Sequence, residues 1–189
     1  MRLGRTELSP GILILAAGIW AFEGGRLLAA VISAVLIHEA GHLLAMAAMG
    51  GRLIKLRFGP FGAVISCRGL GYGAELVCAL TGPLFSILAA YCGAKYGYLI
   101  FAGMSMLLGL FNLLPLTYLD GGRALSCLAA MISPKDITHK LYIFDLIFAS
   151  VLFAVSAVYA VLHGKGAMPA AAFAALLINS FRPDTCKLR

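Results

Sequence analysis

Two histidines and a glutamate lie inside an apolar run, "VLIHEAGHLLAMAAMG", at residues 35–50. A charged side chain near the centre of a membrane helix costs roughly 2.5–3.5 kcal/mol on insertion scales, and such residues usually have a function. On a helix, residues i and i+4 share a face and lie about 6 Å apart along the axis. His38 and His42 therefore predict two imidazole ligands of one metal ion, with Glu39 beside them as a general base.

This HExxH spacing predicts hydrolytic zinc chemistry. Zinc lowers the pKa of a bound water to about 7, and a neighbouring carboxylate takes the proton as the water attacks a carbonyl. A catalytic zinc usually has three protein ligands and one open position. The third ligand must come from the remaining carboxylates and histidines, which are Glu7, Glu23, Glu75, Asp120, Asp136, Asp145, Asp184, His139 and His163.

Asp120 is the predicted third ligand. It lies in "FNLLPLTYLDGGR", where Pro115 breaks the helix and two glycines follow the aspartate. Irregular backbone at membrane depth is tolerated where it lines a protein cavity. Asp145 is the rival, although a carboxylate near a helix start is its simpler interpretation. Asn112, two turns before Asp120, either hydrogen-bonds the substrate or the developing oxyanion, or makes a bond between helices.

The composition indicates what positions these residues. The chain has 189 residues, 61% of them hydrophobic and 12% charged, with a mean hydropathy of +0.95. Soluble domains average about 45–50% apolar and about 25% charged residues, so we expect an all-α polytopic membrane protein of one domain. Five cysteines without a CxxC pair indicate buried thiols rather than a disulfide framework.

About six transmembrane helices are expected, at roughly 10–22, 27–49, 74–94, 97–118, 141–163 and 167–181. The first could be a signal peptide, but it has no convincing small-x-small cleavage site before "EGGR". A span needs about 20 apolar residues, so the first and last are the shortest. Residues 50–73 are Gly-rich with short β-prone runs, which predicts a membrane-associated β-hairpin after the second helix.

The basic residues predict the orientation. The net charge is +7, but the basic residues stand apart between apolar segments, which argues against nucleic-acid binding. With six spans, one side of the membrane collects twelve of the fifteen Lys and Arg residues, and the other side only Arg26, Lys95 and Lys165. By the positive-inside rule both termini are cytoplasmic and the HEAGH half of its helix faces the cytoplasm.

The motifs of this sequence resemble those of a known protein family. "HEAGH" at 38–42 and "NLLPLTYLDGG" at 112–122 are similar to the site-2 protease family of intramembrane zinc metalloproteases, peptidase family M50. "FGPFGAV" at 58–64 and "TGPLFS" at 81–86 resemble the stage IV sporulation protease, a six-span bacterial member that cleaves a membrane-associated sigma-factor precursor. The similarity covers roughly residues 30–125. Neither the PDZ domain of many relatives nor the CBS domain of the sporulation branch is expected here.

The resemblance implies that His38, His42 and Asp120 bind Zn²⁺, that Glu39 activates water and that Asn112 holds the substrate strand. It also implies that the hairpin at 52–67 offers an edge for β-addition. The implied partners are a transmembrane or membrane-associated protein substrate, such as a sigma-factor precursor or an anti-sigma factor, the lipid bilayer, and an inhibitory membrane partner. The alternative is a metal-ion transporter or channel, which predicts polar residues along a path across the bilayer rather than at one depth.

Overall fold

The computed structural model describes residues 2–3, 6–8, 20–21, 24–59, 62–68, 70–117, 119–132 and 137–163. The chain forms two compact units, Met1–Leu113 and Leu114–Arg189, which we describe in turn. The predicted spans at 10–22 and 167–181 lie outside the described residues, apart from the helical residues 20–21. The count of six spans therefore stays a prediction.

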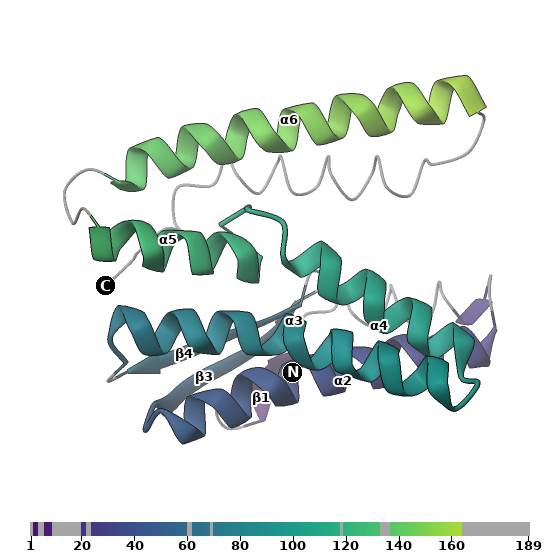
Figure 1. Ribbon diagram of the computed structural model, residues 1–189, viewed down its shortest axis with the longest axis horizontal. Helices are drawn as coiled ribbons and strands as arrows, with labels where there is room; N and C mark the ends of the chain where they lie inside the picture. Colours follow the sequence, from purple (N-terminus) through teal and green to yellow (C-terminus); the bar gives the residue numbers. More distant parts are fainter. Residues whose placement is uncertain are drawn as a thin grey trace. The chain divides into compact units, whose positions relative to one another are not determined.

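The described part of the first unit has three long helices: α2 (Gly25–Ala48), α3 (Tyr72–Lys95) and α4 (Leu99–Asn112). They pack against one another (Figure 1). In the part of the chain that the structure describes, α2 and α3 are the helices long and apolar enough to cross a membrane, each with 24 residues and a hydropathy of 1.8. At 1.5 Å per residue each is about 36 Å long, which exceeds the bilayer core of about 30 Å. The apolar helices predicted at 27–49 and 74–94 are confirmed.

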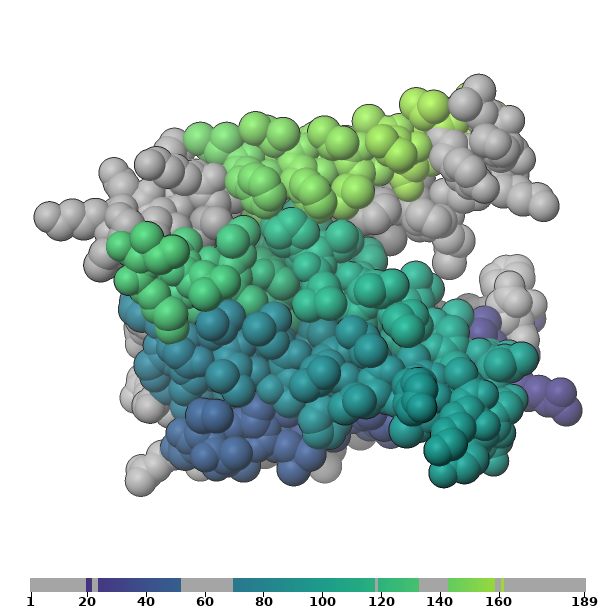
Figure 2. Space-filling model, in the orientation of Figure 1, coloured from purple at the N-terminus to yellow at the C-terminus, as the bar shows by residue number. Residues whose placement is uncertain are grey.

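The helices bury small residues and expose large apolar ones. Ala34, Ala79 and Ala90 are buried, whereas Leu36 is 60% exposed and Leu88 52% exposed. In Figure 2, α3 and α4, in teal, lie at the surface of the face that is shown. Lipid tails solvate leucine as well as a protein interior does, and small residues let membrane helices approach closely. This distribution suits a lipid environment.

Aromatic side chains gather where α3 ends and α4 begins. Gly97 adopts φ +81°, and the Tyr98 N–H donates to the Gly93 carbonyl at 2.8 Å, as in a Schellman cap. Tyr96 and Tyr98 are exposed on this turn, next to Lys95. Tyrosine and lysine of this kind mark a membrane–water interface.

The first unit also contains a four-stranded sheet of order β1-β2-β3-β4. β3 (Arg52–Gly59) and β4 (Gly62–Arg68) pair antiparallel in the segment where the sequence predicts a hairpin, while residues 60–61 of the connection lie outside the described residues. β2 (Thr6–Leu8) pairs parallel with β3, and β1 (Arg2–Leu3) pairs antiparallel with β2. The sequence did not predict β1 and β2, because so few residues show no alternation.

The second unit contains α5 (Asp120–Ile132) and α6 (Ile137–His163). Two predictions are wrong, one at the end of α4 in the first unit and one at the start of α5. The helix predicted at 97–118 ends at Asn112, because Pro115 has no N–H and disfavours helical backbone in the residue before it. The sequence places Asp120 in irregular backbone after Pro115, whereas in the structure it is the first residue of α5; an aspartate at a helix N-terminus is favoured by the helix dipole. The helix predicted at 141–163 is present as α6, with Ile143–Val158 as its apolar part.

Close packing of α2 on α3 gives the first prediction. A Cβ at Gly41 would lie 2.9 Å from the Thr81 carbonyl oxygen and 2.9 Å from Phe85 Cγ. Gly41→Ala should therefore lower the free energy of unfolding by about 1–3 kcal/mol, the usual cost of overpacking, and lower the melting temperature in detergent. Gly103→Ala is the control, because nothing lies within 4 Å of a Cβ there. Equal melting temperatures for the two variants would contradict this packing.

Candidate metal centre

His38 and His42 lie one turn apart on α2 and are 3% and 6% exposed. Their Nε2 atoms are 3.2 Å apart. The two rings meet edge to face, with centroids 4.8 Å apart and planes inclined by 81°. The pairing predicted from the i, i+4 spacing is therefore present, deep in an apolar helix.

Helix α3 holds the other nitrogen of each ring. Nδ1 of His38 lies 2.9 Å from the Ser86 hydroxyl oxygen, and Nδ1 of His42 lies 2.7 Å from the Cys78 carbonyl oxygen. A carbonyl oxygen can only accept, so Nδ1 of a neutral His42 carries the hydrogen and Nε2 keeps a lone pair. Metal-bound histidines almost always have such a partner on the second nitrogen, and it fixes the orientation of the ring.

The separation of the two Nε2 atoms suits zinc. With Zn–N bonds of about 2.0–2.1 Å and tetrahedral angles, two bound nitrogens lie about 3.3 Å apart. The observed 3.2 Å is close to this value. The two nitrogens therefore have the separation of two ligands of one tetrahedral zinc ion.

Glycine at position 82 makes room for this arrangement. A Cβ on Gly82 would overlap the His42 ring, so a larger residue on α3 would displace the imidazole. Ser86 follows Gly82 by one turn on the same helix and is fully buried. The sequence pattern assigned no function to Ser86. The signal that was available is a hydroxyl one turn after a Gly-Pro pair in an apolar helix.

Glu39 follows His38 directly on α2 and is buried. A carboxylate in this position is costly unless it is paired or used. The structure therefore brings His38, Glu39 and His42 together on one helix, as predicted. The role of Glu39 as a general base stays a prediction.

Asp120 and Asn112 lie on either side of the break between α4 and α5. Asp120 is the buried first residue of α5, in the second unit. Asn112 ends α4, and its Nδ2 donates to the Leu108 carbonyl at 3.0 Å. That bond lies within α4, whereas the alternative expected from the sequence was a bond between helices. The ligand role of Asp120 and the substrate role of Asn112 stay predictions.

Asp145, the rival ligand, has a different environment from the one expected. It is 3% exposed on α6 and accepts hydrogen bonds from Thr117. It is thus a buried carboxylate with protein donors, rather than an interfacial one at a helix start. Of the other candidates, Glu23, Asp136 and Asp184 lie outside the described residues.

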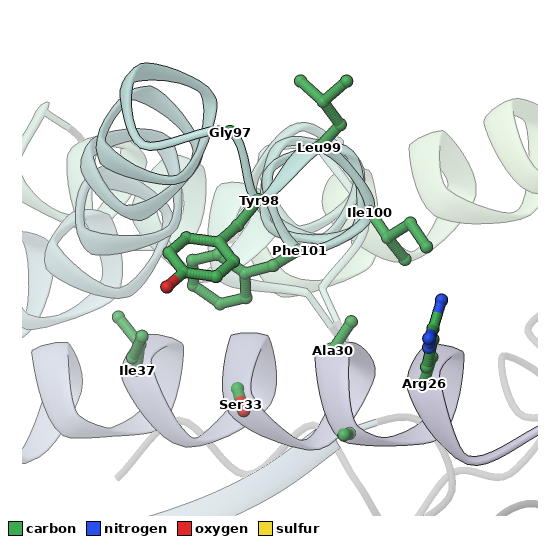
Figure 3. Close-up of a pocket in the computed structure, with 10 residues that line it drawn as sticks. Arg26, Ala30, Ser33, Ile37, Gly97, Tyr98, Leu99, Ile100 and Phe101 are labelled. Atoms are coloured by element: carbon green, nitrogen blue, oxygen red, sulfur yellow. The ribbon is translucent and has the colours of Figure 1, made fainter.

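A separate cavity of about 630 Å³ lies between the first half of α2 and the turn that joins α3 to α4 (Figure 3). Its lining includes Arg26, Ser33, Ile37, Tyr98 and Phe101. The lining contains none of the residues predicted to do chemistry. This cavity is distinct from the histidine pair.

Two comparisons with known proteins concern the fold and the segment around Asp120. The fold is similar to that of a solved structure, the site-2 protease from Methanocaldococcus jannaschii, with a TM-score of 0.70 and 19% identity over 95% of this chain and 91% of that chain. The model of peptidase family M50 matches residues 89–156. This match includes the segment from Asn112 to Gly122 and does not include His38 or His42, so it is independent of the HExxH motif. No curated protein matches the chain in sequence.

The second prediction concerns the hydroxyl that holds His38. Ser86→Ala should leave the fold intact and weaken zinc binding about 10–100-fold, the usual effect of losing such an outer partner. The measurement is a chelator-competition titration of the purified protein in detergent. Thr81→Ala is the matched control, since that hydroxyl donates to the Val77 carbonyl of its own helix. Equal zinc affinities in the two variants would remove Ser86 from the site.

Proposed function

We propose that this protein is a zinc-dependent intramembrane endopeptidase. The observation that carries the proposal is the buried imidazole pair, with Nε2 atoms 3.2 Å apart, on a helix long and apolar enough to cross a membrane. The M50 match over residues 89–156 supports it from a different part of the chain. The similarity in fold to a site-2 protease is consistent with it.

In this proposal His38 and His42 bind Zn²⁺ through Nε2, and Asp120 is the third ligand. Three protein ligands leave one position open, as catalytic zinc sites require. Bound zinc would supply a Lewis acid for the attacking water and the scissile carbonyl. Asp120 contributes the hard carboxylate oxygen that complements two imidazoles.

The protein's own groups handle the protons and the developing charge. Glu39 accepts the proton of the attacking water and returns it to the leaving amine. General base catalysis of this kind contributes about 10²–10⁴-fold. The Asn112 carboxamide donates a hydrogen bond to the substrate backbone or to the developing oxyanion.

The substrate in this proposal is a membrane-spanning or membrane-associated protein, with a sigma-factor precursor or an anti-sigma factor as the first candidates. A helix in lipid satisfies its own backbone groups, so unwinding it for cleavage exposes them at a cost of several kcal/mol each. β4 is the last strand of the described sheet. Pairing of the unwound segment with that strand would satisfy the exposed groups.

We further propose a multi-pass protein with cytoplasmic termini and a site that opens towards the cytoplasm, open to control by an inhibitory membrane partner. The support is the distribution of twelve and three basic residues between the two sides expected from the sequence. His38 lies ten residues before Ala48, the last residue of α2. At 1.5 Å per residue, His38 is about 15 Å and His42 about 9 Å from the end of the helix.

The third prediction tests Glu39. Glu39→Gln should lower the rate of cleavage of a co-expressed membrane substrate by at least about 10²-fold, because the amide cannot accept the proton of the attacking water. Zinc content should stay at one ion per chain, since the ligands are unchanged. Glu75→Gln, in the first turn of α3, is the matched carboxylate control and should cleave normally.

Cleavage retained in Glu39→Gln would remove this residue from its role. A metal-ion transporter is tested in the same preparation by reconstituting the wild type into vesicles. Zinc uptake into the vesicles without cleavage of any candidate substrate would favour transport over proteolysis.

A further inference from the structure

We propose that Asp145 is a positioning residue that fixes the backbone leading into Asp120. The inference rests on the proposed function, in which Asp120 is a zinc ligand. It is carried by contacts inside the second unit alone, between the segment before α5, the first turn of α5 and helix α6.

The Asp145 carboxylate accepts three hydrogen bonds from one residue. The Thr117 backbone nitrogen lies 3.2 Å from each oxygen of the Asp145 carboxylate. The Thr117 hydroxyl donates to Oδ2 of the same carboxylate. Asp145 is 3% exposed, in the third turn of α6. A buried carboxylate is destabilising unless donors satisfy it, so the three bonds explain how the charge is tolerated.

Thr117 needs this partner because its backbone lies between two helices. α4 ends at Asn112 and α5 begins at Asp120. In such a break the N–H groups have no helical carbonyl to bond, and a buried one without a partner is costly. A hydrogen bond to a carboxylate is roughly twice as strong as one to a neutral carbonyl. Asp145 thereby fixes the segment at the residue three positions before Asp120.

The same segment also packs against α5. A Cβ on Gly122 would overlap the Leu116 carbonyl, so the first turn of α5 lies directly on this peptide group. The Leu119 N–H donates to the Leu116 carbonyl at 2.8 Å, which closes a turn just before Asp120. Leu116 and Leu119 are among the most fully buried large side chains described. Residues 116–117 thus contact both the first turn of α5 and the carboxylate on α6.

This arrangement assigns Asp145 to the support of the site rather than to the ligand set. Both of its oxygens are engaged by Thr117. Groups that orient metal ligands typically affect metal affinity or activity 10–100-fold when removed. Loss of the Asp145 charge should therefore loosen Asp120 and weaken zinc binding while the histidine pair remains.

The test uses the full chain purified in detergent and measures zinc affinity by chelator competition, together with kcat and KM for a membrane substrate. Asp145→Asn should weaken zinc binding about tenfold or more and lower kcat with KM unchanged. Thr117→Val, which keeps the size but loses the hydroxyl donor, should change both quantities in the same direction by less. Thr117→Ser, which restores the hydroxyl, should return zinc affinity to the wild-type value.

Ser150→Ala is the control on α6, because that hydroxyl donates to the Leu146 carbonyl of its own helix; it should match the wild type. If Asp145→Asn does not fold, the comparison of Thr117→Val with Thr117→Ser decides. Wild-type zinc affinity in Asp145→Asn, or equal affinities in the two Thr117 variants, would overturn the inference while leaving the proposed function standing. A wild type that binds no zinc would instead overturn the proposed function.

Discussion

The structure depends on holding two imidazoles side by side in an apolar helix. Burial would ordinarily leave such rings with unsatisfied nitrogens, at a cost that a membrane helix cannot offset with water. Here the Ser86 hydroxyl and the Cys78 carbonyl take one nitrogen of each ring. The other two nitrogens face each other at 3.2 Å, a geometry that a cation stabilises.

That requirement explains the small residues between α2 and α3. Gly41 lets α2 approach the Thr81 carbonyl, and Gly82 leaves space for the His42 ring. In a membrane, packing of this kind takes the place of the hydrophobic effect in holding helices together. The large apolar side chains accordingly point outwards, as Leu36 and Leu88 do. The same close contact therefore builds the helix pair and the candidate metal centre.

The features that depend on local residue spacing could be predicted from the sequence. His38 and His42 pair because i and i+4 share a helical face, and α2 and α3 are recognisable from length and hydropathy alone. Prediction from the sequence failed for other features. α5 was not predicted because two glycines, which are poor helix formers, directly follow its first residue. The hydrogen bonds between Asp145 and Thr117 join residues 28 positions apart. Ser86 was passed over because a hydroxyl in an apolar helix carries no sign of what it faces.

The zinc-edge X-ray absorption spectrum of the purified full chain would show whether the His38–His42 pair binds a zinc ion. We expect one zinc ion per chain. Its ligands should be two imidazole nitrogens, with oxygen atoms as all the others, at about 2.0–2.2 Å. Sulfur ligation at about 2.3 Å, or a spectrum with fewer than two imidazoles, would contradict it.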